Sequence, residues 1–325
     1  MIASLQVVAG LILLFFGAEI MVRGSVAVAR AFRISPHMIG LTVIAFGTSS
    51  PELFVSLKAA LHGSPGIAVG NVVGSNIANI LLMIGLVGLV APFSCSGRGC
   101  RRDGSFLLLA TAILVALTFA GTIERWHGVG MLGLLVLYLG YCYRDDRKGD
   151  PEESLMAKEA AEFETELPTA RATVYCLGGM AGVLLGAHLL VDGAIVMARL
   201  LEISEAVIGI TMVAIGTSLP ELATTIVAAW RKHSDVAIGN IIGSNIFNTL
   251  GVLGVVSTVV PLDIPPEITV ANIWLMVAVT VAFVLLTFTR KNLGRAVAIT
   301  FFLAYAAFIS SQFGAPMQAI AVSGQ

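Results

Sequence analysis

Two glutamates, Glu52 and Glu221, each follow a proline inside an apolar stretch of the chain. A carboxylate at the depth of a lipid bilayer costs at least about 2.5 kcal/mol, so a glutamate placed there twice needs a cation or a proton as its partner. Hydroxyl side chains three and four residues before each glutamate offer further oxygen ligands: Thr48 and Ser49 in GTSSPE, and Thr217 and Ser218 in GTSLPE.

A second polar phrase follows each glutamate, GNVVGSNIAN at residues 70–79 and GNIIGSNIFN at residues 239–248. The serine and the last asparagine of each phrase are four residues apart, so they share one face of a helix. These pairs, which can complete a shell of ligands around an ion, are Ser75 with Asn79 and Ser244 with Asn248. The other asparagines, Asn71, Asn76, Asn240 and Asn245, are candidates to bind backbone that a broken helix leaves open.

The prolines before the glutamates predict such breaks. Pro51 and Pro220 have no N–H, so the carbonyls of Gly47 and Gly216 lose their helical partners. In a membrane, an open carbonyl is tolerated only where it faces a cavity or an ion. Carboxylate, hydroxyl, amide and backbone oxygens together suit Ca²⁺ or Na⁺, and not the metals that prefer nitrogen or sulfur.

The two sets of motifs belong to an internal repeat with an offset of 169 residues. At this offset residues 40–85 match residues 209–254 at 21 of 46 positions. Fourteen of these matches fall on Gly, Pro, Glu, Ser, Thr and Asn, which apolar segments do not share by chance. The whole chain is therefore read as two related halves.

The composition is that of a membrane protein with several spans, because 57% of the residues are apolar, only 12% are charged and the mean hydropathy is +0.92. Apolar stretches of sufficient length predict ten membrane-spanning helices. They cover roughly residues 3–30, 37–60, 67–92, 105–121, 127–143, 172–199, 206–229, 236–260, 269–289 and 294–312.

Five spans in each half is an odd number, so the second half must enter the membrane from the opposite side. The expected fold is an all-α membrane protein of ten transmembrane helices, in two inverted five-helix repeats with broken helices at the midplane. Residues 1–143 form the first repeat, residues 144–171 an acidic cytoplasmic linker, and residues 172–325 the second repeat.

Charge predicts the orientation, because fifteen of the 19 Lys and Arg fall at one set of loops and three at the other. The positive-inside rule then places both termini outside and the central loop in the cytoplasm of an inner or plasma membrane protein. The four cysteines fall at the predicted cytoplasmic ends, where thiols stay reduced.

Other charged residues lie within the predicted spans at the start of each repeat. Glu19 and Arg23 are four residues apart, as are the matching His188 and Asp192, so each pair can neutralise itself along its own helix. Structural pairing is the favoured interpretation, and a proton-relay role for His188 and Asp192 is the alternative.

Together the two motif sets resemble the two alpha-repeats of the cation/Ca²⁺ antiporter superfamily, whose best-known members are the sodium/calcium exchangers. The resemblance implies that Glu52 and Glu221 chelate a central Ca²⁺ with Thr48 and Thr217. It implies Na⁺ sites that use the carbonyls of Ala45 and Ala214 and the hydroxyls of Ser49, Ser75, Ser218 and Ser244. Asn79 and Asn248 would lie near the centre, and the first and sixth spans would slide against the others.

The expected function is secondary active exchange of Na⁺ for Ca²⁺ by alternating access. Protons should compete, because two facing carboxylates cannot both stay ionised in an empty site of low dielectric constant. A Ca²⁺/H⁺ antiporter on the same fold is the alternative, a cation channel is less favoured, and an intramembrane hydrolase leaves the repeated hydroxyls and amides unexplained. We expect no enzymatic activity, no cofactor and no nucleic-acid partner, and a functional monomer in the lipid bilayer.

Overall fold

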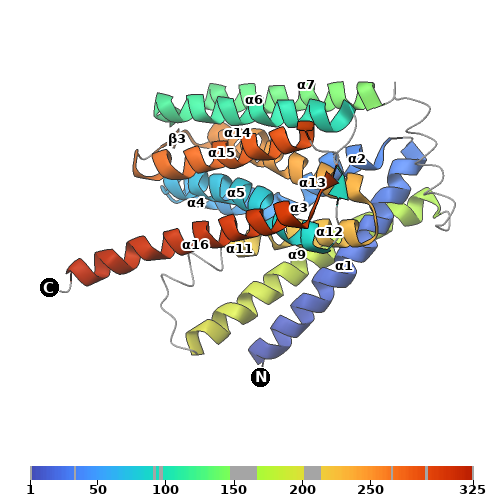
Figure 1. The fold of residues 1–325 in the computed structure, drawn as a ribbon, viewed down its shortest axis with the longest axis horizontal. Coiled ribbons are helices and arrows are strands. Elements are labelled where there is room, and N and C mark those ends of the chain that lie inside the picture. The colour runs from blue at the N-terminus through green and yellow to red at the C-terminus, as the bar shows by residue number, and fades with distance from the viewer. Residues whose placement is uncertain are drawn as a thin grey trace.

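The computed structural model describes residues 2–32, 34–90, 93–94, 98–146, 167–200, 214–264, 266–289 and 292–323. Nearly all of these residues are helical (Figure 1). Most of the predicted linker, residues 147–166, and the start of the predicted span 206–229 lie outside this description.

The described part of the first half contains seven α-helices and one short π-helix. They are α1 (Ile2–Phe32), α2 (Pro36–Ile39), η1 (Gly40–Ile44), α3 (Ala45–Thr48), α4 (Ser50–Leu61), α5 (Pro65–Val90), α6 (Arg98–Ala120) and α7 (Arg125–Asp146). The second half contains α9 (Thr169–Leu200), α11 (Ala214–Thr217), α12 (Leu219–Trp230), α13 (Ser234–Ile246), η3 (Phe247–Val252), α14 (Leu253–Val259), α15 (Pro266–Thr289) and α16 (Arg295–Ser323).

Within the described ranges, seven helices are long and apolar enough to cross a membrane, or eight when the bent pair formed by Pro36–Thr48 and Ser50–Leu61 counts as one span. The protein is therefore an integral membrane protein, as its composition predicts. The α11–α12 segment and the apolar part of α16, Arg295–Ser311, coincide with the remaining predicted spans. The total of ten spans stays a prediction.

Two very short antiparallel strand pairs depart from the all-helical expectation. β1 (Phe93–Ser94) pairs with β4 (Asn292–Leu293), and β2 (Thr122–Ile123) pairs with β3 (Leu262–Asp263). The backbone groups between helices need partners, and two loops that meet can supply them to each other. Each pair joins loops that the predicted topology places on one side of the membrane.

Helices α1 and α9 lie side by side and run obliquely to the other long helices (Figure 1). Glycines permit this close contact: a Cβ added at Gly17 would lie 2.7 Å from the backbone nitrogen of Val183, and one at Gly179 would lie 2.3 Å from that of Met21. Small residues let membrane helices approach closely where lipid supplies no hydrophobic drive between them. Every seventh residue along both helices is such a glycine: Gly10, Gly17 and Gly24 on α1, and Gly179, Gly186 and Gly193 on α9.

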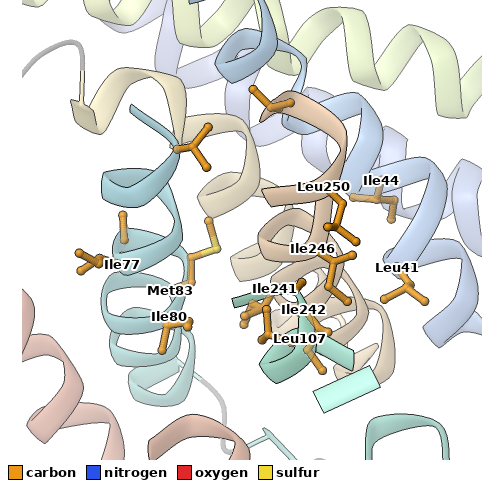
Figure 2. Close-up of a cluster of buried hydrophobic side chains, with 14 of the residues drawn as sticks. Leu41, Ile44, Ile77, Ile80, Met83, Leu107, Ile241, Ile242, Ile246 and Leu250 are labelled. Carbon is orange, nitrogen blue, oxygen red and sulfur yellow. The ribbon is translucent and has the colours of Figure 1, made fainter. Parts of the chain in front are cut away.

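Helices α5 and α13 occupy the centre of the molecule. In the most apolar window of α5, 83% of the residues are buried, and in the span that begins with α13 the share is 94%, against 22% for α9. The buried side chains around them form one apolar core (Figure 2). It includes Leu41, Ile44, Ile77, Ile80, Met83, Leu107, Ile241, Ile242, Ile246 and Leu250. The second polar phrase of each repeat lies here, residues 70–79 on α5 and residues 239–248 on α13 and the start of η3.

The cysteines only partly follow the expectation of reduced thiols. Cys142 and Cys176 are free and buried, and Cys176 is within hydrogen-bond distance of Ser25 Oγ (3.2 Å). Cys100, in contrast, is disulfide-bonded. The expectation is therefore wrong for Cys100, because charge alone does not report which thiols a fold brings together.

Candidate ion-binding site

Both proline motifs break their helices, one residue before the proline-containing helix begins. Helix α3 ends and α4 begins around Ser49 (φ −82°, ψ 8°), and the span bends there by 42°. The break between α11 and α12 is at Ser218 and has nearly the same geometry (φ −87°, ψ 2°). Each break places a glutamate, Glu52 or Glu221, in the first turn of the following helix.

The two breaks differ in how their open carbonyl is satisfied. The Ser50 hydroxyl donates to the carbonyl oxygen of Gly47 (2.7 Å), in place of the N–H that Pro51 lacks. The Gly47 carbonyl therefore loses its helical N–H partner, as expected, but it is not left without a hydrogen bond. The residue that matches Ser50 in the second repeat is Leu219, which has no hydroxyl to offer the Gly216 carbonyl.

The two halves exchange hydrogen bonds at the glutamates. The Ser49 hydroxyl donates to Glu221 Oε1 (2.8 Å), and the matching Ser218 hydroxyl lies 3.5 Å from Glu52 Oε1. The hydroxyl of Ser75 lies at the same distance, 3.5 Å, from that Glu52 oxygen. Both carboxylates are fully buried and close enough to interact electrostatically. The predicted ligands from the two repeats therefore converge on one site.

Several buried oxygen and nitrogen atoms of the predicted ligands have no partner within the protein. In the described part of the chain they include Oε2 of Glu52, Oε2 of Glu221, Oγ1 of Thr217, and both amide atoms of Asn79 and Asn248. Each is buried, and a buried polar atom without a partner costs free energy. A cation bound among the oxygen atoms would supply their missing partner, and a set of oxygen ligands with two carboxylates fits Ca²⁺ or Na⁺.

Asparagines hold the backbone of both glutamates. Asn71 Nδ2 donates to the Glu52 carbonyl (3.3 Å) and to the Ser56 hydroxyl (3.0 Å). In the second repeat Asn240 Nδ2 donates to the Glu221 carbonyl (3.4 Å) and to the Thr225 hydroxyl (2.8 Å). Asn71 and Asn240 thus bind backbone beside the breaks, as expected. The expectation is wrong for Asn76 and Asn245, because Asn76 Nδ2 donates to the Thr249 hydroxyl (2.9 Å) and Asn245 Nδ2 donates to the Ile241 carbonyl of its own helix (2.7 Å).

Other predicted ligands are present but already engaged. The Thr48 hydroxyl donates to the Ile44 carbonyl (3.0 Å), and the Ser244 hydroxyl donates to Asn240 Oδ1 (3.4 Å). The Ala45 carbonyl accepts the Ser49 N–H (3.0 Å), and a carbonyl oxygen keeps a second lone pair. Ala214 is the first described residue of α11, so its carbonyl stays a prediction.

The π-helix that contains Asn248 is a feature that sequence reasoning misses. Its counterpart Asn79 lies inside the continuous α-helix α5, whereas Asn248 lies in η3. Short π-segments inside helices are frequent at functional sites because they change where one side chain points. Two nearly identical motifs therefore adopt different helical conformations, and their sequences give no indication of this difference.

The charged pairs along α1 and α9 form as expected. Arg23 Nε lies 2.6 Å from Glu19 Oε1, and His188 Nε2 lies 3.3 Å from Asp192 Oδ2. Sequence reasoning misses a second partner of Glu19, since Arg231 Nε also donates to Glu19 Oε2 (2.7 Å). The spacing of residues along one helix predicts ion pairs within that helix, but it does not predict a partner that comes from another helix.

Comparison with known proteins points to one family. The family described as sodium/calcium exchanger protein matches residues 2–144 and 171–314. Inner membrane protein YrbG of Escherichia coli is 37% identical over 297 residues, which are 90% of this chain and 90% of that protein. Sodium/calcium exchanger MaX1 of Methanosarcina acetivorans is 28% identical over 335 residues, covering 92% of this chain and 95% of that one.

Solved structures agree with the sequence comparison. A structure of the sodium-calcium exchanger NCX_Mj, soaked with 2.5 mM Na⁺ and 0.1 mM Ca²⁺, superposes with a TM-score of 0.82 at 33% identity. The match covers 96% of this chain and 98% of that chain. Sequence family and fold thus agree over nearly the whole length, and the chain belongs to the sodium/calcium exchanger family.

Proposed function

We propose that this protein exchanges Na⁺ for Ca²⁺ across the membrane by secondary active antiport with alternating access. The observation that carries the proposal is the buried pair Glu52 and Glu221, each of which keeps one carboxylate oxygen without a partner in the protein. Two carboxylates balance the charge of one Ca²⁺. We propose no enzymatic activity and no resident cofactor, because the work of such a site is to bind and release ions.

Exchange rather than free passage follows from the cost of an empty site. Two buried carboxylates without a cation would carry uncompensated charge in a medium of low dielectric constant. The protein should therefore change its access state only when Ca²⁺, Na⁺ or protons occupy the site. This requirement couples the flow of one ion to the opposite flow of another, and it makes protons competitors of Ca²⁺.

The roles of the ligands follow the two repeats. Glu52 and Glu221 with Thr48 and Thr217 would hold Ca²⁺. The Na⁺ sites would use the carbonyls of Ala45 and Ala214, the hydroxyls of Ser49, Ser75, Ser218 and Ser244, and the central amides of Asn79 and Asn248.

We further propose that ten transmembrane helices form two inverted five-helix repeats. Two sets of contacts support this arrangement. The Ser49–Glu221 bond has a counterpart between Ser218 and Glu52, which is the same pair of positions with the repeats exchanged. The glycine contacts between α1 and α9 are exchanged in the same way, as a two-fold relation between the halves requires.

Sodium is the proposed driving ion, and potassium is not required. The family resemblance implies an acidic residue at the position of Asn248 in members that need K⁺, whereas this chain has asparagine there and at the matching Asn79. A K⁺ ion beside Ca²⁺ would add a positive charge that no carboxylate in the motifs balances. Glu19 and Asp192, the nearest other acids along the repeats, already have basic partners.

Flux in proteoliposomes tests the function and the driving ion together. An imposed Na⁺ gradient should drive ⁴⁵Ca²⁺ uptake when all K⁺ is replaced by choline. Uptake driven by a pH gradient alone would establish the Ca²⁺/H⁺ antiporter instead. Uptake that stops without K⁺ and returns with it would show that the charge-counting argument is wrong.

A further inference from the structure

The end of the site helix α12 is joined to α1 by an ion pair. Helix α12 ends at Trp230, and the next residue, Arg231, binds both carboxylate oxygens of Glu19, with Nε 2.7 Å from Oε2. An aromatic contact accompanies the pair, because the rings of Phe15 and Trp230 lie 5.7 Å apart. Helix α12 carries Glu221 in its first turn, so these contacts connect the ion site to α1.

The burial of Glu19 makes this pair consequential. The Glu19 side chain is only 10% exposed, whereas Arg231 and Arg23 are 39% and 50% exposed. Arg23 belongs to the same helix as Glu19 and stays beside it wherever α1 moves. Arg231 belongs to another helix, so only this partner responds to movement between α1 and α12.

The second repeat lacks an equivalent of the Glu19–Arg231 pair. At the 169-residue offset, Glu19 matches His188 and Arg231 matches His62, the residue that follows α4. His188 is 72% exposed and contacts Asp192 on its own helix, while His62 Nδ1 lies 2.7 Å from the Lys58 carbonyl of its own helix. The surface of α9 that corresponds to the covered surface of α1 is thus open.

We propose that the Glu19–Arg231 pair is a positioning element for transport that forms in only one of the two access states. The inference rests on the proposed alternating-access function. In a transporter with inverted repeats, alternating access moves one part of the protein against the other around a fixed site. The contacts at Ser49, Ser218 and the α1–α9 glycines are related by exchange of the two halves, so we infer that the second state resembles the first with the halves exchanged. In the other state, the end of α4 should therefore cover α9 at His188, and α1 should leave the end of α12.

The two access states should differ in free energy, because Glu19 and Arg231 are matched by His188 and His62 in the other repeat. The described state gains an ion pair between Glu19 and Arg231, whereas the other state would bring His62 toward His188. Two histidines cannot form the same ion pair. The Glu19–Arg231 pair therefore favours the described state, and its loss should shift the population toward the other.

Cross-linking measures this shift directly. In a chain with the free cysteines Cys142 and Cys176 replaced by alanine, cysteines at positions 62 and 188 are joined by a short bifunctional thiol reagent in lipid vesicles. Glu19→Gln and Arg231→Gln should each raise the cross-linking rate several-fold, and the double variant should add little to either. Arg23→Gln is the matched control, because it removes a guanidinium from the same carboxylate without separating α1 from α12.

Transport measurements distinguish this positioning role from a merely structural one. Loss of the pair should change the half-saturating Ca²⁺ concentration in opposite directions on the two faces of the membrane, and Arg231→Lys should restore much of the wild-type balance. Equal cross-linking in wild type, Arg231→Gln and Arg23→Gln would overturn the proposal. So would the absence of cross-linking in every folded variant that still transports Ca²⁺.

The cross-linking result is independent of the driving ion. A protein that moves Ca²⁺ on a pH gradient, and not on a Na⁺ gradient, would refute the proposed driving ion while the effect of Arg231→Gln on cross-linking still stands. Thermal stability of the detergent-solubilised variants checks folding, and Arg231→Gln replaces Glu19→Gln if the buried carboxylate proves necessary for folding.

Discussion

At the scale of single residues, the two site glutamates have unequal surroundings. Glu52 Oε1 has two hydroxyls at 3.5 Å, from Ser218 and Ser75, whereas Glu221 Oε1 receives one closer hydroxyl, at 2.8 Å from Ser49. The second oxygen of each carboxylate has no partner in the protein. The charge of these oxygens, rather than their hydrogen bonds, is therefore the property that an ion would use.

Replacing either glutamate by glutamine tests that charge with little change in shape. Glu52→Gln and Glu221→Gln should each lower Ca²⁺ uptake by at least about 100-fold, since a loss near 3 kcal/mol is expected when a buried charge pair loses one partner. Uptake of ⁴⁵Ca²⁺ and calorimetric Ca²⁺ binding measure the effect. The exposed Glu124→Gln is the control and should behave as wild type. Wild-type uptake by folded Glu221→Gln protein would refute the site assignment.

At the scale of the elements, glycines fix the distance between α1 and α9. The backbones of the two helices touch at Gly179, where an added Cβ would lie 2.3 Å from Met21 N. Gly178, the preceding residue, has no heavy atom within 4 Å of such a Cβ. A substitution at Gly179 therefore tests the packing of the two helices, whereas the same substitution at Gly178 tests helix propensity alone.

Gly179→Ala should therefore destabilise the protein by about 1–3 kcal/mol, because the helices must move apart. Gly178→Ala should be neutral or slightly stabilising, because alanine favours helix more than glycine does. Thermal unfolding in detergent gives the comparison. Equal stabilities for the two variants would show that this interface tolerates more separation than its geometry indicates.

The carboxylate of Asp103 links the helices α2, α6 and α7. It is fully buried on α6 and accepts from His37 Nε2 of α2 (2.7 Å) and from Arg102 Nε (2.6 Å). Arg102 also donates to Asp145 of α7 (2.7 Å). The segment that leads into the Glu52 motif is therefore held to α6 and α7 by charge.

Asp103→Ala should cost about 3–5 kcal/mol of stability, because it leaves buried cationic partners without their counter-charge. Asp145→Ala is the control, and should cost less than about 1 kcal/mol because the Asp145 side chain is 27% exposed. Chemical or thermal unfolding in detergent measures both. Similar losses for both variants would mean that burial does not decide the strength of this network.

At the scale of the whole molecule, the distribution of charge predicts the orientation in the membrane. Fifteen Lys and Arg lie at the predicted inner ends and three at the outer ends. The predicted orientation places Cys100 at a cytoplasmic end, where a disulfide is unusual because the compartment is reducing. The orientation therefore needs a direct experimental test.

A cysteine placed at Glu159 should react with an impermeant thiol reagent only from the cytoplasmic side, and one at Gly324 only from outside. Labelling of intact cells and of inside-out vesicles measures the two accessibilities. The reverse pattern would overturn the orientation, and a mixed pattern would indicate insertion in both directions.

The sequence by itself determined the membrane class, the repeat and the chemistry of the site. Glu52, Glu221 and their neighbouring hydroxyls could be identified because a carboxylate in an apolar segment needs a partner wherever the segment lies. The Glu19–Arg23 and His188–Asp192 pairs could be predicted too, because residues four apart on a helix are neighbours. The role of Asn71 and Asn240 followed from the broken backbone beside them.

Only the tertiary structure decided which groups meet across helices. Ser49 and Glu221 are 172 residues apart, and Glu19 and Arg231 are 212 apart. Such pairs depend on how helices from the two halves are placed and tilted, which local periodicity does not encode. The same reason applies to Asn79 and Asn248, because identical motifs take an α-helical or a π-helical backbone according to the helices packed around them.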